Sequence, residues 1–392
     1  MRPIYLSLLL LFCVSISSGQ TSIQFDESSY DAVIQKAKQL HKPIFFMGYA
    51  TWCPHCNKMK KDVFTDPAVI AFMEKNFICA ALDIDKPEGA KLKNKFGMHS
   101  YPAFVFLDEN ETLLYNVTGE LKAADILNEA KNALDPKKQL PYLKSEFEKD
   151  LSNANKCLDY LMAIRKGQDR KSISAPAHQY LATQSEKQLI STINWRIIAN
   201  AVTDINSREF QYVLKHQDEF AKITSPLRVE RKIVSIASEL LTPYTNSLDT
   251  INYKKQREIA KSINLQKIDS LVFANDLLIY ERSKSWKSYQ KTTIESVEKQ
   301  AWNDSKMLKE IAQIYSSNIS DKIALEHAIL WVKRALEIKD TYDGNIILSR
   351  LYLKISDKKQ AEVYARKASE IAKSLGWNSK DADDLFRELD IK

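Results

Sequence analysis

Trp52-Cys53-Pro54-His55-Cys56 is the stretch that decides the fold, and it places two cysteines two residues apart. The apolar run 43–47 leads into it and a helical pattern, 57–61, follows. A Cys-X-X-Cys at a strand-to-helix junction suits dithiol–disulfide exchange. The first sulfur lies at a helix N-terminus, where unpaired N–H groups and the helix dipole favour a thiolate. We therefore predict that Cys53 attacks and that Cys56, one turn further along, resolves the mixed disulfide.

The two intervening residues tune this chemistry. Pro54 has no N–H, which costs nothing in the first turn of a helix. His55 can be cationic beside the thiolate and stabilise it. Because a stabilised thiolate favours the reduced form, the disulfide becomes a better oxidant. The dipeptide therefore favours an oxidase or isomerase over a strong reductant.

Two other uses of the motif are open from the residues alone. A structural zinc needs two more Cys or His at similar spacing, and no second pair exists; His99 is the other nearby histidine in a loop setting. A structural disulfide closing so short a loop would stabilise little. The sequence thus predicts no metal and no cofactor.

The N-terminus has the pattern of a secretory signal. Arg2 precedes the apolar run 4–14, and small residues follow at 15–19. We expect cleavage before Gln20, so that residues 1–19 are a signal peptide. Cys13 follows Phe12 rather than a small residue, which does not favour a lipid anchor. No other stretch approaches the ~20 apolar residues of a membrane span. An exported protein of the bacterial periplasm, without a transmembrane segment after signal removal, is expected.

Cysteine usage agrees with exchange chemistry. Beyond the signal, the chain holds Cys53, Cys56, Cys79 and Cys157. One isolated dithiol in an exported protein indicates exchange rather than crosslinking. Cys79 lies in the apolar run 77–82 and is expected to be a buried core thiol. Cys157, on a helical pattern, is given a structural role.

The 392 residues are enough for two or more domains. Prolines 136 and 141 frame a polar stretch, and we predict a linker at 136–142 between a domain at 20–135 and an all-helical region at 143–392. Ser28 and Ser29 should cap the first helix, whose apolar face includes Leu40. The expected strands are 22–25, 43–49, 77–84, 103–107 and 112–117, and the expected helices are 30–40, 68–75, 87–96 and 121–134. This order predicts a mixed sheet with helices on both faces.

Together with Ser100-Tyr101-Pro102, the dithiol motif and this element order resemble the thioredoxin superfamily over residues 22–134. The segment 62–67 is most similar to the branch that holds the C-terminal domain of DsbD. The resemblance implies an α/β thioredoxin fold in which Pro102 is cis and faces the dithiol. It also implies that the backbone of Tyr101 pairs with a substrate peptide. Trp52 is expected to pack beside the motif.

The chain departs from that family at one place. Thioredoxin has a buried aspartate six residues before its first cysteine, and Met47 stands there in this chain. The lysine associated with that aspartate corresponds to Ala81. The usual proton acceptor of the resolving cysteine is therefore missing, so proton transfer must use water or another group.

The helical region contains a repeat. Residues 328–338 align with 361–371 at an offset of 33, close to the tetratricopeptide period of ~34. The Gly and Pro of that consensus are absent, and a plain helical bundle stays an alternative. The sequence favours a tetratricopeptide-like array. Trp286, Trp302 and Trp331 are expected in its core.

The formal net charge of +7 comes from the helical region and is spread over some 250 residues, which predicts solvated helix faces and no nucleic-acid partner. The leading hypothesis is an exported thiol–disulfide oxidoreductase that exchanges disulfides with protein substrates and a redox partner protein. The alternative is a non-enzymatic interaction protein whose thioredoxin-like domain is a docking module. The intact dithiol favours the first. The direction of electron flow and the oligomeric state stay open.

Overall fold

A computed structural model of the chain describes residues 21–167 and 172–390. These residues form two compact units. The first holds the described residues up to Val202 together with 207–212 and 222–224. The second holds 203–206, 213–221 and the chain from Ser225 onward. The predicted signal peptide, with Cys13 and its cleavage site, lies outside the described residues.

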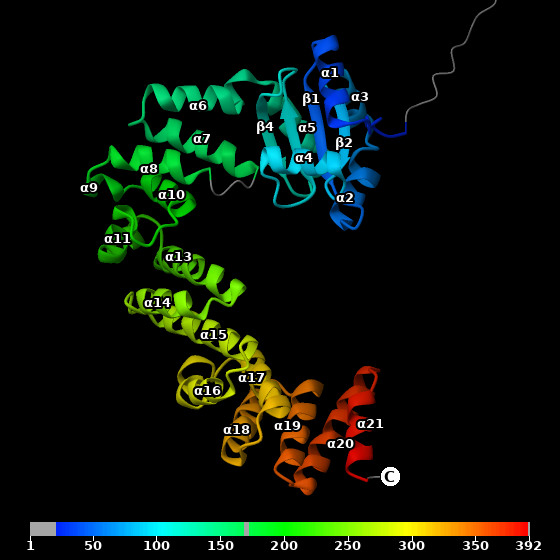
Figure 1. The fold of residues 1–392 in the computed structure, drawn as a ribbon, viewed down its shortest axis with the longest axis vertical. Helices are drawn as coiled ribbons and strands as arrows, with labels where there is room; N and C mark the ends of the chain where they lie inside the picture. The colour runs from blue at the N-terminus through cyan, green and yellow to red at the C-terminus, as the bar shows by residue number, and fades with distance from the viewer. Residues whose placement is uncertain (1–20, 168–171, 391–392) are drawn as a thin grey trace, which may run out of the picture. The chain divides into compact units, whose positions relative to one another are not determined.

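The first unit is built on a four-stranded mixed sheet (Figure 1). Its strands have the order β2-β1-β3-β4. β1 pairs parallel with β2 and antiparallel with β3, and β3 and β4 form an antiparallel hairpin. Their bounds are Ile44–Tyr49 for β1, Ile78–Asp83 for β2, Ala103–Leu107 for β3 and Leu113–Thr118 for β4. The predicted mixed sheet is confirmed.

Helices cover both faces of this sheet. Side chains alternate between the two faces along each strand, and both sets are apolar here, so each face needs a covering layer. Phe46 and Val105 face a core that includes residues of α1 (Tyr30–Leu40) and α4 (Pro87–Phe96). Phe45, Phe104 and Phe106 face a second core. That core is covered by α2 (Pro54–Lys58), the π-helical turn η1 (Met59–Val63), α3 (Pro67–Asn76) and α5 (Ala123–Leu134).

Local sequence signals place the helix ends. The Ser29 hydroxyl accepts a hydrogen bond from the Ala32 N–H at the start of α1, and Asp66 caps α3 in the same way. Gly97, at φ +60°, ends α4 in the left-handed conformation that glycine adopts freely. One predicted core position is wrong: Leu40, the last residue of α1, is 58% exposed. It lies past the point where the helix leaves the sheet.

The predicted strand at 22–25 is also wrong. Residues 22–25 form no strand, and the next residue, Asp26, makes a single parallel bridge to Ala80. The N–H of Ile23 donates instead to the Phe64 carbonyl oxygen, at 2.9 Å. The Ile23 N–H is thus bonded to the loop after η1, and it is not available for pairing with a neighbouring strand.

Two helices follow the sheet and pack on its last strand. The segment predicted as a linker, 136–142, holds a 3₁₀ turn (η2, Pro136–Lys138) and the start of α6 (Leu140–Lys149). Helices α6 and α7 (Ala154–Lys166) both contact β4. Lys166 Nζ lies 2.8 Å from Glu129 Oε2 on α5. The side chain of Asn116 occupies the space where a Cβ on Gly167 would be. The domain boundary near residue 136 stays a prediction.

The rest of the described chain is helical, as predicted (Figure 1). The helices after α7 are α8 (Ser174–Ala182), α9 (Glu186–Leu189), α10 (Thr192–Ala201), α11 (Arg208–Lys215), α12 (Gln217–Ile223), α13 (Pro226–Ser247), α14 (Thr250–Lys261), α15 (Gln266–Arg282), α16 (Trp286–Gln300), α17 (Ser305–Asn318), α18 (Lys322–Ile338), α19 (Tyr342–Lys354), α20 (Lys358–Leu375) and α21 (Lys380–Glu388).

The two aligned segments lie in α18 and α20. Helix α18 packs on α17, and α20 packs on α19, so each segment is the second helix of a pair. Alanines of both segments are fully buried, where small side chains let helices approach closely. Trp331 is buried in the core of these pairs, and Trp286 and Trp302 pack against it. Across residues 21–167 and 172–390, no helix combines the length and the apolar character needed to cross a bilayer.

Candidate redox site

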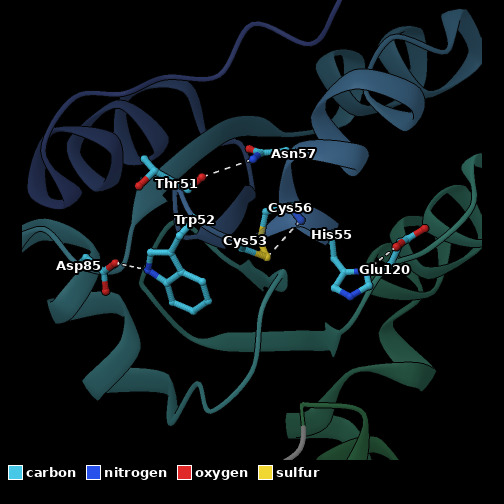
Figure 2. Close-up of a disulfide and its surroundings, with 8 residues drawn as sticks. All are labelled: Thr51, Trp52, Cys53, His55, Cys56, Asn57, Asp85 and Glu120. Carbon is cyan, nitrogen blue, oxygen red and sulfur yellow. Dashed lines mark hydrogen bonds and ion pairs between the residues drawn. A yellow bond between two sulfur atoms is a disulfide. The ribbon is translucent and has the colours of Figure 1, made fainter. Parts of the chain in front are cut away.

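The two cysteines of the motif are joined by a disulfide at the start of α2 (Figure 2). Cys53 is the N-cap residue of this helix and Pro54 is its first residue. The N–H of Cys56 donates a hydrogen bond to Cys53 Sγ at 3.2 Å. The helix terminus therefore offers a backbone donor to the first sulfur, the arrangement that stabilises a thiolate there.

Accessibility separates the two cysteines. Cys56 is fully buried, whereas Cys53 keeps 4% of its surface exposed. Both cysteines are therefore buried in the disulfide form, and Cys53 is the more accessible of the two. This ordering agrees with attack by Cys53 and resolution by Cys56.

Trp52 stands at the edge of the site. It is 67% exposed, and its indole Nε1–H donates to Asp85 Oδ2 at 2.7 Å. Asp85 follows β2, so the bond fixes a large aromatic surface beside the disulfide (Figure 2). Trp52 therefore lies beside the motif and is held by a hydrogen bond rather than by burial, and its part in the chemistry stays a prediction.

His55 lies on the other side of the disulfide from Trp52 and is paired with Glu120 (Figure 2). His55 Nδ1 is 2.7 Å from Glu120 Oε2, and Glu120 Oε1 bonds Lys58 Nζ. Hydrogen bonds from Lys58 and then from His55 lower the pKa of Glu120, so this carboxyl is ionised at neutral pH. Sequence reasoning missed Glu120, which lies 65 residues from His55. The available signal was an acidic residue directly after the Gly119 that ends a strand.

The Tyr101–Pro102 peptide bond is cis, as the family resemblance implied. It directly precedes β3, which pairs with the strand that leads into the motif. The Pro102 carbonyl accepts a hydrogen bond from the Gly119 N–H at 2.8 Å. Tyr101 is half-buried and packs against the core cluster that contains both cysteines. The assigned substrate-binding role of Tyr101 and Pro102 stays a prediction.

The layer beneath the disulfide is apolar at the two positions where thioredoxin carries charge. Met47 and Ala81 are both buried and belong to the core cluster of Cys53 and Cys56. Neither side chain can accept a proton. The structure thus brings the two departures noted in the sequence to one place.

The two other described cysteines are unreactive thiols. Cys79 lies in β2 and Cys157 in α7, and both are buried free thiols. Burial raises the pKa of each thiol to about 12. Neither holds appreciable thiolate at neutral pH, and the thiolate is the reactive form.

Comparison with known proteins agrees with this geometry. The family model of a thioredoxin-like domain matches residues 30–134. The protein disulfide isomerase-like 5-3 of Oryza sativa subsp. japonica is 26% identical over 114 residues, which are 29% of this chain and 25% of that protein. The thiol:disulfide interchange protein DsbD 1 of Pseudomonas aeruginosa is 30% identical over 109 residues, which are 26% of this chain and 18% of that protein.

The chain thus spans less than a third of the length of the curated relatives it matches. A solved structure, the solution structure of a thioredoxin from Thermus thermophilus, is 22% identical, covering 29% of this chain and 89% of that one with a TM-score of 0.27. The match to the family model falls on the part that holds the sheet and the dithiol. Residues 30–134 of this chain belong to the family of thioredoxin-like domains.

Proposed function

We propose that this protein is a thiol–disulfide oxidoreductase that exchanges disulfides with protein substrates through Cys53 and Cys56. The observation that carries the proposal is the disulfide at the start of α2, in which Cys53 caps the helix and is the more accessible cysteine. The disulfide isomerases and the interchange protein among its relatives support it.

The reaction follows from the positions of the two sulfurs. In the reducing direction, the Cys53 thiolate attacks a substrate disulfide, a mixed disulfide forms and one substrate thiolate leaves. The Cys56 thiolate then attacks Cys53 Sγ, the second substrate thiolate leaves and both leaving sulfurs take protons. Two electrons pass to the substrate, and the protein becomes the Cys53–Cys56 disulfide. Oxidation of a substrate dithiol is the same sequence reversed.

The neighbouring residues have assigned parts in this proposal. Pro54 and His55 tune the potential, and Trp52 borders the site. The backbone at Tyr101 and Pro102 pairs with the substrate peptide. Since Met47 and Ala81 are apolar, the proton of Cys56 passes to water or to another group.

Exchange with a fluorogenic disulfide-bonded peptide tests the proposal. The wild-type protein, reduced beforehand, should release the fluorophore with second-order kinetics. Cys53→Ser should abolish this release, whereas the matched variant Cys79→Ser should not alter it. A folded wild-type protein that reacts no faster than free glutathione would refute the proposed activity.

We further propose that the chain is exported to the periplasm through residues 1–19. Arg2, the apolar run 4–14 and the small residues 15–19 support this. Expression in a Gram-negative host, fractionation and N-terminal sequencing would test it. A periplasmic protein beginning at Gln20 is the expected result, and a cytoplasmic protein beginning at Met1 would contradict it.

The helical region is proposed to be a tetratricopeptide-like array that recruits the protein substrate or redox partner. The paired packing of α17 with α18 and of α19 with α20 supports it. Cross-linking through a Cys56→Ser variant, which holds its substrate covalently, should capture proteins in the full chain. Equal capture by a chain truncated after residue 202 would refute recruitment by the second unit.

A further inference from the structure

Glu120 lies between two segments that frame the dithiol, one at Pro102 and one at Met59. The N–H of its neighbour Gly119 donates to the Pro102 carbonyl at 2.8 Å. On its other side, the N–H of Leu121 donates to Met59 Sδ, at 3.3 Å, on the helix that continues from α2. The backbone of Glu120 is thus fixed by bonds of the flanking residues, and its side chain is free for another use.

That side chain is bound to two cationic or basic groups, both from the dithiol helix. Glu120 Oε2 lies 2.7 Å from His55 Nδ1, and Oε1 bonds Lys58 Nζ. An ionised carboxylate only accepts hydrogen bonds, so Nδ1 of His55 must carry the hydrogen. The pair therefore fixes the ring orientation and places the imidazole hydrogen on Nδ1.

The charges of the three groups decide the effect on the sulfur. With His55 protonated, His55, Lys58 and Glu120 together carry one positive charge, and with His55 neutral they carry none. Without the carboxylate, each of these totals is one unit more positive. Nearby positive charge stabilises a thiolate. The carboxylate therefore opposes the thiolate-stabilising effect of the Pro-His dipeptide.

We propose that Glu120 is a positioning residue that acts through His55 and Lys58 and makes the Cys53–Cys56 couple more reducing than its Cys-Pro-His-Cys motif alone would make it. The inference rests on the proposed exchange at these cysteines. It names a determinant of their potential that lies outside the motif. Asp85, the acidic residue bound to Trp52 on the opposite side, is left unchanged in the comparison below.

Glu120→Gln is the informative variant, because it keeps the size and one acceptor of the side chain and removes its charge. Glu109→Gln removes the same charge from the turn between β3 and β4, at the other end of these strands. The five residues of β3 span about 17 Å, which separates Glu109 from Glu120 by about this distance. Glu120→Asp keeps the charge on a shorter side chain.

Two measurements follow on the full chain. The first is the pH midpoint of Cys53 alkylation. The second is the redox equilibrium with glutathione at pH 5.5 and at pH 8.5, on either side of the range where histidines titrate. The wild type and the variant are compared at each pH, so the effect of the carboxylate is measured both below and above that range. Glu120 remains ionised at pH 5.5 and Lys58 remains cationic at pH 8.5, since their mutual hydrogen bond lowers the pKa of Glu120 and raises the pKa of Lys58.

Glu120→Gln should lower the alkylation midpoint and shift the equilibrium toward the reduced protein by at least about threefold, or ~14 mV in a two-electron couple. Glu109→Gln should match the wild type, and Glu120→Asp should lie nearer the wild type than Glu120→Gln does. An unchanged equilibrium in Glu120→Gln, a shift toward the oxidised protein, or an equal shift in Glu120→Asp would overturn the inference.

The test separates this inference from the proposed function. A wild-type protein with no exchange activity and no reversible couple would remove the function and the inference together. A wild-type protein that exchanges disulfides, but whose potential ignores Glu120→Gln, would remove the inference alone.

Discussion

Met47 lies directly opposite Ala81 in the parallel pair of β1 and β2. Both are buried in the core cluster that contains the disulfide. Thioredoxin places its buried aspartate and lysine at these two positions. In this chain both charged residues are replaced by apolar ones, so no buried charge is left without its partner. Restoring one of them should therefore be costly.

Met47→Asp should destabilise the protein by about 3 kcal/mol, because it buries a carboxyl group with no partner. Burial would raise the pKa of this new carboxyl above its unfolded value. The stability is then greatest below the unfolded pKa and is lost as the pH rises through the folded pKa. Urea unfolding at pH 5 and pH 8 checks this, with Met47→Leu as a control that should cost less than about 1.5 kcal/mol. A larger loss at pH 5 than at pH 8 would contradict the argument.

Cys56→Ser should accumulate a mixed disulfide with substrate, whereas Cys53→Ser should form none. The reason is that Cys53 lies at the helix N-terminus and is the more accessible cysteine, and only Cys56 can release what Cys53 captures. Non-reducing gel electrophoresis after acid quenching shows the adduct. Adducts on Cys53→Ser would mean that the two roles are reversed.

His55→Ala should make the couple more reducing and raise the pH midpoint of Cys53 alkylation, since it removes a group that can carry positive charge beside the thiolate. For the wild type we expect a potential between those of thioredoxin and DsbA, roughly −270 to −120 mV. Equilibration with glutathione measures both. His178→Ala, which removes a histidine 3.9 Å from Glu209 on a different helix, is the matched control. Equal potentials for His55→Ala and wild type would show that His55 does not tune the site.

The double variant Cys79→Ala and Cys157→Ala should keep full exchange activity. Both thiols are buried, and burial raises the pKa of each to about 12, so neither supplies thiolate. In the folded, oxidised wild type, maleimide labelling at pH 7 should modify neither. Loss of exchange in a double variant that keeps the wild-type circular dichroism spectrum would show that one of them takes part.

Asp26 should make the stability of the first unit depend on pH in acid. Its hydrogen bond from Lys36 is the largest of the effects that lower the pKa of Asp26 to about 2. Because the folded pKa is below the unfolded value, this contribution is present above the unfolded pKa and disappears as the pH falls through the folded pKa.

The variant Asp26→Asn should therefore unfold more easily than the wild type at pH 6, by about 1–2 kcal/mol after solvent screening, and equally easily near pH 2. Urea titrations at pH 6, 4 and 2 measure the difference. A constant difference at all three values would assign the effect to packing rather than to charge.

Much of the first unit could be predicted from the sequence because its signals are local. Apolar runs gave β1 and β2, and Ser29, Asp66 and Gly97 marked helix ends through side-chain or backbone preferences that act within a few residues. The Cys-X-X-Cys spacing also acts over one turn. It led to the pairing of Cys53 with Cys56.

The features that were missed depend on tertiary neighbours. The segment 22–25 has the composition of a strand, but Ile23 bonds the loop after η1 instead. Glu120 lies next to His55 because Gly119 is bonded to Pro102 and Leu121 to Met59 of η1. No periodicity or motif in the sequence indicates the pair of His55 and Glu120, because the order of the strands in the sheet brings these two residues together.

Helices α6 and α7 give the sheet a property that the thioredoxin-like segment alone does not have. The end of α7 contacts side chains on both faces of β4. On one face, Lys166 Nζ bonds Tyr115 of β4 and Glu129 of α5. On the other face, the Asn116 side chain packs against Gly167. An uncovered outer strand offers unpaired backbone groups to any extended chain, and so invites sheet-to-sheet aggregation. A protein that exchanges disulfides with substrate chains, as proposed, would meet such extended segments. Because α6 and α7 both contact β4, they would hinder an extended substrate chain from pairing with this strand.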